Sequence, residues 1–206
     1  MSTQAPRVLL LDVMGTLVSE PFEVDVPRFF GVTLADLYGL LTPGLWVDFE
    51  KNLVDETTFL QNFFADRRAY DHHGLKTCLY HSYQFLDGIE AVLGELKAAG
   101  ARMHLLSNYP RWYTLIEEKL ALSRYAPWSF VSCDTGVRKP DADAYLGAAS
   151  ALGVRPDACV FVDDRAKNCA AARALGMRAL HFENASRLRA DLVKVGVLAR
   201  RPTSCP

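Results

Sequence analysis

The sequence has no excess of charge of either sign and no long hydrophobic run. Its 206 residues include 23 lysines and arginines and 24 aspartates and glutamates, a formal net charge of −1. This balance favours neither nucleic acid nor an anionic membrane surface as a partner. No apolar segment approaches the roughly 20 residues that span a bilayer. Residues 1–6 lack the basic and apolar regions of a secretory signal, so we expect neither a membrane span nor export.

Cysteine is sparse, and its spacing excludes the common structural uses of this residue. The five cysteines are scattered and odd in number, with no Cys-x-x-Cys pair. This pattern argues against both a zinc site and a disulfide framework. Cys159 and Cys169 stand among apolar residues and are expected to pack as small core residues. A reducing compartment fits these features, and we expect a cytoplasmic location.

The chain does contain a regular alternation of helix and strand patterns from Asp87 onward. Helices are predicted at residues 89–99, 112–122, 141–152, 167–175 and 186–195, and short strands at 102–106, 130–132, 158–162 and 178–182. Alternation at this spacing predicts an α/β fold with a doubly wound, mostly parallel sheet. Residues 200–206 are expected to form a frayed tail.

Residues 18–85 break this alternation and contain helical patterns without a convincing strand. The helical patches lie at 27–30, 34–40, 46–52, 56–65 and 74–84. The segment holds 13 of the 22 aromatic residues of the chain. Such residues either fill the core of a small helical bundle or, for a few of them, line a pocket for a flat or apolar substrate. We predict a core of residues 1–17 and 86–206, with a helical insertion at 18–85.

The first strand pattern leads directly into a carboxylate and a tight turn. A continuous apolar run at residues 8–11 is typical of a central parallel strand. Asp12 follows at the carboxyl end, where open α/β sheets place their chemistry. A carboxylate there can attack phosphorus to give an aspartyl phosphate, or bind a metal, or do both. The alternative is a strand-end aspartate that caps the turn at Gly15. The Thr16 hydroxyl is expected to hold a neighbouring carboxylate or a phosphate oxygen.

A later apolar strand pattern ends in Asp163 and Asp164. Adjacent carboxylates repel each other and are costly without a cation, and Mg²⁺ prefers such oxygen ligands. We predict a magnesium site with Asp12, Asp164 and the backbone carbonyl of Met14 as ligands, and with Asp163 orienting a bound water. Asn168, one helical turn later, is expected to hold this loop. Helix capping is the alternative, but it requires only one of the two aspartates.

Two further segments supply groups suited to phosphate. Ser107 and Asn108 follow the strand predicted at 102–106 and are neutral donors for phosphoryl oxygens. Lys139 precedes a predicted helix, and its charge matches a phosphate or the charge that develops between phosphate and Asp12. Each of these residues alone is ordinary in a turn or on a surface. Their appearance in order at strand ends makes a chance arrangement a poor explanation.

These segments resemble the haloacid dehalogenase-like (HAD) hydrolase superfamily over nearly the whole chain. Residues 12–17 look like its first motif, 107–108 its second, 139–140 its third and 163–164 its fourth. The insertion at 18–85 is similar in place and size to the helical cap of that superfamily. The resemblance implies a Rossmann-like core, a cap that governs substrate specificity, a Mg²⁺ cofactor and phosphatase activity.

A closer likeness is to the plastid-type flavin mononucleotide hydrolase branch of this superfamily. It is carried by short segments at residues 12–14, 25–27, 29–31, 49–51, 107–110 and 181–185. This likeness implicates the aromatic residues of the insertion in holding an isoalloxazine ring. The implied partner is a small phosphate ester, and the implied assembly is a monomer or a homodimer.

Met14 departs from the usual pattern of these phosphatases. The second residue after their nucleophile is an aspartate, which protonates the leaving oxygen and later activates water. Methionine does neither, and general acid–base help is worth about 10²- to 10⁴-fold in rate. We therefore expect a slow phosphatase that favours good leaving groups, unless His104 or a residue of the insertion supplies the proton.

Three functions compete on the sequence alone. The first is a Mg²⁺-dependent phosphatase for a small metabolite, with flavin mononucleotide (FMN) as the leading substrate. The second is a carbon–halogen hydrolase, because dehalogenases of this superfamily also lack the second aspartate. They usually carry tyrosine there and need no metal, so the intact pair Asp163 and Asp164 argues against it. The third is a phosphate-binding or regulatory protein that has lost turnover, for which Met14 is the only support.

Overall fold

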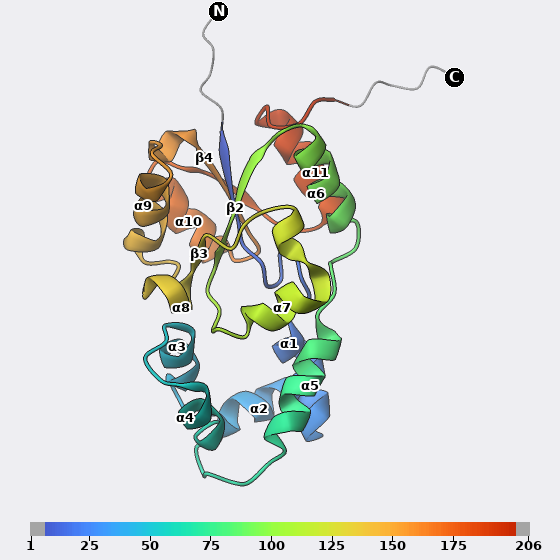
Figure 1. Cartoon of the computed structure of the whole chain (residues 1–206), viewed down its shortest axis with the longest axis vertical. Coiled ribbons are helices and arrows are strands. Elements are labelled where there is room, and N and C mark those ends of the chain that lie inside the picture. The colour runs from blue at the N-terminus through green and yellow to red at the C-terminus, as the bar shows by residue number, and fades with distance from the viewer. Residues whose placement is uncertain (1–6, 201–206) are drawn as a thin grey trace, which may run out of the picture.

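The computed structural model describes residues 7–200, which form a parallel sheet flanked by helices (Figure 1). The strands are β1 (Val8–Leu11), β2 (Arg102–Ser107), β3 (Phe130–Val131), β4 (Cys159–Asp163) and β5 (Arg178–His181). All neighbouring strands run parallel, in the order β3-β2-β1-β4-β5. The chain thus builds outward from β1 in both directions, and the predicted doubly wound α/β architecture is confirmed.

Eleven α-helices surround this sheet within the described residues. They are α1 (Pro21–Phe30), α2 (Leu34–Leu40), α3 (Leu45–Glu50), α4 (Glu56–Gln61), α5 (His72–Ser82), α6 (Ile89–Ala98), α7 (Tyr113–Leu120), α8 (Ser132–Thr135), α9 (Ala142–Ala151), α10 (Ala166–Ala174) and α11 (Ala185–Lys194). Within residues 7–200, none of them has both the length and the apolar character needed to cross a bilayer.

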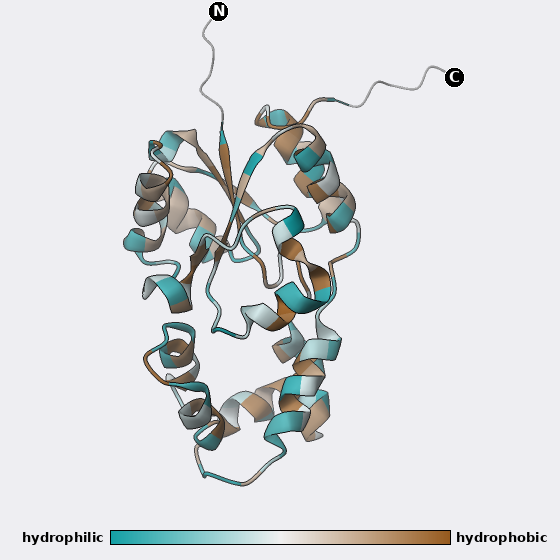
Figure 2. Cartoon of the chain, viewed as in Figure 1, coloured by the Kyte–Doolittle hydropathy of each residue, from teal (hydrophilic) through white to brown (hydrophobic). Residues whose placement is uncertain are grey.

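Alternation along β1 divides the apolar core between the two faces of the sheet. Leu9 and Leu11 pack into one cluster together with residues of α6 and α11, whereas Leu10 packs into another with residues of α9 and α10. Figure 2 shows β1 in brown between helices that carry both apolar and polar residues. Because both faces of β1 are covered, its residues are buried without exception. Cys159 and Cys169 are fully buried in the second cluster, as predicted.

Helices α1 to α5 lie between β1 and β2 in the sequence and project beyond one end of the sheet (Figure 1). That end carries the carboxyl termini of the strands. A short loop joins β1 to α1. Within it, Met14 forms an isolated β-bridge with Val18, and Val18 forms a second one with Phe85, in the segment that leads from α5 back to the sheet. The two connections therefore pass side by side at the carboxyl end of the central strand.

The first helix of this segment begins earlier than the sequence analysis predicts. The structure starts α1 at Pro21, six residues before the patch predicted at 27–30. Glu20 is its N-cap, with a side chain that accepts the Phe22 N–H, and Pro21 is suited to the first helical turn because it needs no N–H partner there. The apolar spacing at 22–26 is too irregular to reveal this turn. Residues 1–6, for which we predict no secretory signal, and the predicted tail after Arg200 lie outside the described residues.

Candidate active site

The carboxyl end of the central strands brings three charged side chains into direct contact. Lys139 Nζ lies 2.6 Å from Asp12 Oδ1 and 2.8 Å from Asp163 Oδ2. The register that pairs Leu11 with Val162 brings Asp12 and Asp163 together at the ends of neighbouring strands. The Lys139 side chain is 2% exposed and that of Asp163 is fully buried, so these charges face each other out of water.

Thr16 joins the first carboxylate to the second of the acidic pair. Its hydroxyl accepts the Asp164 N–H at 3.0 Å and lies 3.2 Å from Asp12 Oδ2 and 3.4 Å from Asp164 Oδ1. A hydroxyl has one proton, so it donates to one of these carboxylates at a time. Gly15 makes this approach possible, because its φ is +72° and a Cβ there would lie 2.8 Å from Asp164 Oδ2.

Asp163 is held by protein donors on both of its oxygens. Asn168 Nδ2 lies 3.0 Å from each oxygen, and the Arg165 N–H donates to Oδ1 at 2.8 Å. Together with Lys139, these donors fix the orientation of Asp163 at the turn from β4 into α10. Asn168 thus holds the loop through Asp163, and its own Oδ1 is buried without a hydrogen-bond partner in the described chain.

The three carboxylates form a compact group with more negative than positive charge. Ligand oxygens of Asp12, Asp163 and Asp164 lie within 4.8 Å of one another. With one lysine against three carboxylates, the ionised group carries two net negative charges. Burial raises the pKa of Asp12 to about 7, although the Lys139 ammonium opposes this shift. Burial alone would lower the pKa of Lys139, but Asp12 and Asp163 hold it above its ordinary value.

The two neutral residues predicted to bind phosphate occupy different settings. Ser107 ends β2 and is buried, and its Oγ has no hydrogen-bond partner within residues 7–200. The Asn108 amide makes two bonds of 2.8 Å to the Lys139 backbone, one as donor and one as acceptor. Asn108 therefore fixes the segment that carries Lys139, whereas Ser107 is buried beside it and is not among the residues that line the cavity.

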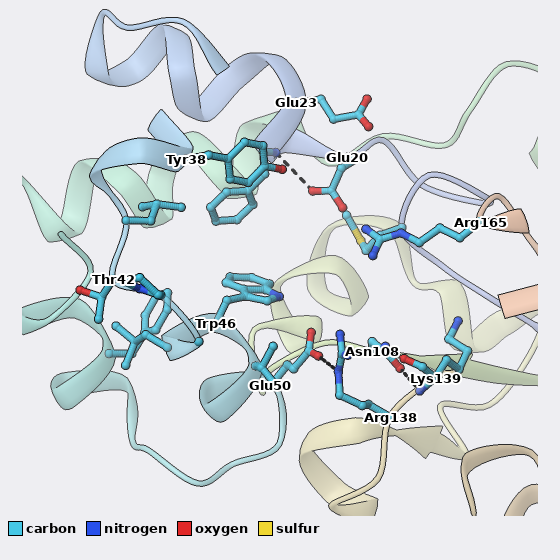
Figure 3. A pocket seen from close by; sticks show the side chains of 18 of the residues that line it. Glu20, Glu23, Tyr38, Thr42, Trp46, Glu50, Asn108, Arg138, Lys139 and Arg165 are labelled. Carbon is cyan, nitrogen blue, oxygen red and sulfur yellow. Dashed lines mark hydrogen bonds and ion pairs between the residues drawn. The ribbon is translucent and has the colours of Figure 1, made fainter. Parts of the chain in front are cut away.

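A cavity of about 440 Å³ opens from this group toward the helices of residues 21–61 (Figure 3). Asp12, Met14, Asn108 and Lys139 lie at its sheet end. Its other walls combine aromatic and charged side chains: Phe22, Tyr38, Trp46, Phe59, Phe63, Glu20, Glu23, Glu50, Arg138 and Arg165. Some aromatic residues of the insertion thus line the cavity, and others fill the packed interior, so both of the uses considered from the sequence occur.

Five charged residues in the walls were not predicted as site residues from the sequence: Glu20, Glu23, Glu50, Arg138 and Arg165. Glu50 is 2% exposed, and it forms an ion pair with Arg138, the residue before Lys139. Burial raises the pKa of Glu50, an effect that Arg138 opposes. Burial likewise raises the pKa of Glu20 to about 7, and Arg165 follows the acidic pair. The available signals were the charged neighbours of motif residues, Arg138 beside Lys139 and Arg165 beside Asp164.

Comparison with known proteins identifies the family. The family model of the haloacid dehalogenase-like hydrolases matches residues 6–176. The chain belongs to the haloacid dehalogenase-like hydrolase family. The resemblance that the four ordered motifs carry is thereby confirmed, and so is the prediction of a hydrolytic enzyme.

Named relatives include a plant hydrolase and bacterial phosphatases. The chain is 46% identical to flavin mononucleotide hydrolase 1 of Arabidopsis thaliana, over 92% of this chain and 78% of the relative. It is 33% identical to a phosphoglycolate phosphatase of Xylella fastidiosa, over 100% of this chain and 96% of the relative. The name of the plant relative places that protein in the chloroplast, so a cytoplasmic location for this chain stays a prediction.

Solved structures of the family share the fold at low sequence identity. A predicted HAD-like hydrolase from Porphyromonas gingivalis has a TM-score of 0.72 at 21% identity, over 93% of this chain and 98% of that one. A HAD family enzyme from Bacteroides thetaiotaomicron has a TM-score of 0.71 at 17% identity, over 87% and 95%. The latter was crystallised with magnesium and inorganic phosphate. These likenesses establish the Rossmann-like fold.

Proposed function

We propose that this hydrolase is a Mg²⁺-dependent phosphatase that cleaves FMN through an aspartyl phosphate on Asp12. The observation that carries the proposal is the contact of Asp12 with Lys139 at the base of an aromatic-walled cavity. The identity to a plant FMN hydrolase across most of both chains supports the choice of substrate. The sequence departs from the usual pattern only at Met14.

Asp12 has the position and the setting of a nucleophile. It lies at the floor of the cavity, so an ester phosphate placed there meets its carboxylate. Attack joins an Asp12 oxygen to phosphorus and releases the alcohol, and water then attacks the same phosphorus to free the carboxylate. Lys139 holds Asp12 oriented and offsets the negative charge that accumulates during both displacements. The buried Ser107 hydroxyl is a donor for a phosphoryl oxygen.

The residues present fit a magnesium ion. Asp12 and Asp164 are the ligands we assign, together with the Met14 backbone carbonyl. The excess of two negative charges in the carboxylate group equals the charge of one divalent cation, and oxygen donors suit Mg²⁺. The bonds from Lys139, Asn168 and Arg165 to Asp163 support an orienting role for it outside the ligand set. When bound, the ion would neutralise phosphate charge during transfer.

The walls of the cavity favour a flat aromatic substrate over a small aliphatic one. Trp46 contacts the rings of Phe22 and Phe59, which line the same space. The volume of about 440 Å³ is in the range of small-molecule sites and exceeds what a short carboxylic acid phosphate requires. We therefore assign the helices of the insertion to substrate choice, with the isoalloxazine ring against these aromatic side chains.

The test is phosphate release from FMN and from 4-nitrophenyl phosphate, measured with Mg²⁺ and with chelator. We expect release from both esters that requires Mg²⁺ and is abolished by Asp12→Asn. A preference for FMN in kcat/KM supports the substrate assignment. Release from the aryl ester alone would refute FMN as the substrate. No release above that of the variant would refute the phosphatase and favour a phosphate-binding or regulatory role.

A further inference from the structure

Met14 leaves the proposed reaction without its usual proton donor, and the cavity contains four carboxyl groups that could replace it. They belong to Asp12, Glu20, Glu23 and Glu50. Asp12 is the proposed nucleophile, and Glu50 is paired with Arg138. Glu23 is exposed at the opening. Glu20 is the remaining group, and its place in the fold follows from the loop after β1.

The loop after β1 turns back on itself and carries the chain past Met14. The Gly15 N–H donates to the Val18 carbonyl at 2.8 Å, and the Val18 N–H donates to the Val13 carbonyl at 2.9 Å. These bonds place Val18 beside Met14, in a parallel bridge. Glu20 stands two residues beyond Val18. The loop that has no carboxyl group at Met14 therefore places the Glu20 carboxyl group in the cavity wall.

The Glu20 side chain is fixed by the helix that it caps. Its Oε1 accepts the Phe22 N–H at 3.2 Å, and the described residues give Oε2 no hydrogen-bond donor. A proton on this carboxyl group is therefore carried by Oε2. Figure 3 shows Glu20 across the cavity opening from Glu50 and Arg138, with Arg165 beside it.

The polar and charged groups that face Glu20 come from α1 and from the turn between β4 and α10. Burial is the main influence and raises the pKa of Glu20 to about 7. The Phe22 N–H and the Arg165 guanidinium oppose this shift, and the carboxylates of Glu23 and Asp164 add to it. A carboxyl group with this pKa carries its proton in a large fraction of molecules at neutral pH, and it accepts one readily after losing it.

We propose that Glu20 is the general acid and base of the reaction, in place of the missing aspartate. The proposal rests on the phosphatase function proposed above. As Asp12 forms its bond to phosphorus, the bond from phosphorus to the ester oxygen breaks and that oxygen takes the Glu20 proton. Water then bonds to phosphorus, the bond to Asp12 breaks, and the water proton returns to Glu20. Each turnover consumes one water and restores both carboxyl groups.

His104, the other candidate from the sequence, does not reach the reacting groups. Its Nδ1 lies 2.7 Å from Ser129 Oγ, and it is absent from the cavity wall. Burial lowers its pKa, which favours the neutral ring. A neutral ring outside the cavity cannot protonate a leaving oxygen inside it.

Glu20→Gln provides the test, because glutamine keeps the oxygen that accepts the Phe22 N–H and loses the acidic proton. Rates are measured on FMN, phenyl phosphate and 4-nitrophenyl phosphate, whose leaving groups need decreasing help from an acid. We expect kcat/KM to fall by about 100-fold on FMN and by less than about 3-fold on the nitrophenyl ester. In the wild-type enzyme kcat/KM on FMN declines above about pH 7, and the variant loses that decline.

Two controls separate this role from a structural one. Asp25 lies on the same helix but outside the cavity wall, so Asp25→Asn removes a comparable charge and is expected to alter the rates on all three esters by one common factor. Met14→Asp in the Glu20→Gln background restores an acid at the usual position and is expected to recover activity on FMN. An equal loss on all three esters, or no loss, in Glu20→Gln with an active wild type would overturn the role of Glu20 alone. A wild type inactive on every ester would overturn the proposed function and this role together.

Discussion

The carboxylate end of the sheet and the helical wall of the cavity are built in opposite ways. At the sheet, the side chains of Asp12, Asp163 and Lys139 are almost fully buried and held by charged or hydrogen-bonding partners. In the wall, Tyr38 is 61% exposed, and Trp46 meets its neighbours through aromatic ring contacts. The sheet end is an array of buried charged groups, whereas the wall is mainly an aromatic surface with one buried ion pair, Glu50–Arg138.

This difference predicts separate contributions of the two regions to catalysis and to substrate choice. Hydrogen bonds and ion pairs between buried groups are directional, so few substitutions at the sheet end can preserve the geometry. Aromatic contacts are less directional and can accept other side chains of similar size. We expect changes at the sheet end to affect every substrate, and changes in the wall to affect substrates according to their shape.

The largest expected effect is the loss of the nucleophile. Asp12→Asn should lower phosphate release at least about 10³-fold on every ester, because no aspartyl phosphate can form. The fold should survive, since Lys139 keeps its pairing with Asp163 and burial already disfavours the Asp12 charge. Single-turnover release on FMN and the nitrophenyl ester is the measurement, with thermal unfolding as the control. A loss confined to one ester would contradict the prediction that changes at the sheet end affect every substrate.

The next effect concerns stability. Lys139→Met leaves the buried carboxylates of Asp12 and Asp163 without their shared cation, and loss of one partner from a buried pair costs about 3–5 kcal/mol. We expect the free energy of unfolding in urea to fall by that amount without Mg²⁺. The matched control is Lys167→Met, since this lysine is exposed on α10, and it should change stability by less than about 0.5 kcal/mol. Equal losses in the two variants would contradict the assignment.

The sheet end could be predicted from the sequence because each of its residues follows a recognisable strand. Asp12, Ser107 and Asp163 stand at or just beyond the ends of apolar runs, and parallel strands bring those ends to one edge. The contact of Lys139 with two carboxylates was harder to predict from the sequence. It depends on Asn108, whose amide bonds to the Lys139 backbone across 31 residues.

The cavity wall could not be predicted in the same way. Trp46 meets Tyr109 and Trp112, which follow β2 more than 60 residues later, and no periodicity in the sequence encodes that contact. Glu20 was missed because the first turns of α1 lack a regular apolar spacing. The Glu-Pro pair at 20–21 was the available signal, as proline is common in the first helical turn.

A substitution in the wall should separate binding from chemistry. Trp46→Phe keeps an aromatic ring and reduces its area, so we expect KM for FMN to rise by about 5- to 10-fold, a fraction of the 1–3 kcal/mol that ring stacking provides. kcat on FMN and the kinetics on 4-nitrophenyl phosphate should change by less than about 2-fold. Trp128→Phe is the matched control, because Trp128 lies outside the cavity and bonds to Glu117. An equal rise in KM in both variants would refute a ring-binding role.

An effect of similar size is a pH dependence of stability that originates at Glu20. Its pKa rises from an ordinary 4.5 to about 7 on folding, chiefly through burial. Between these values the folded chain keeps a proton that the unfolded chain has lost, so the free energy of unfolding decreases as pH rises and levels off above pH 7. Because the side chain is partly exposed, we expect about 1–2 kcal/mol rather than the full shift. The measurement is urea unfolding of wild type and Glu20→Gln at pH 5 and pH 8 in chelator. The difference between the two proteins should change by that amount, with the variant relatively more stable at pH 8. A difference that is constant with pH would mean that Glu20 titrates in the folded protein as it does in water and would contradict the burial of its carboxyl group.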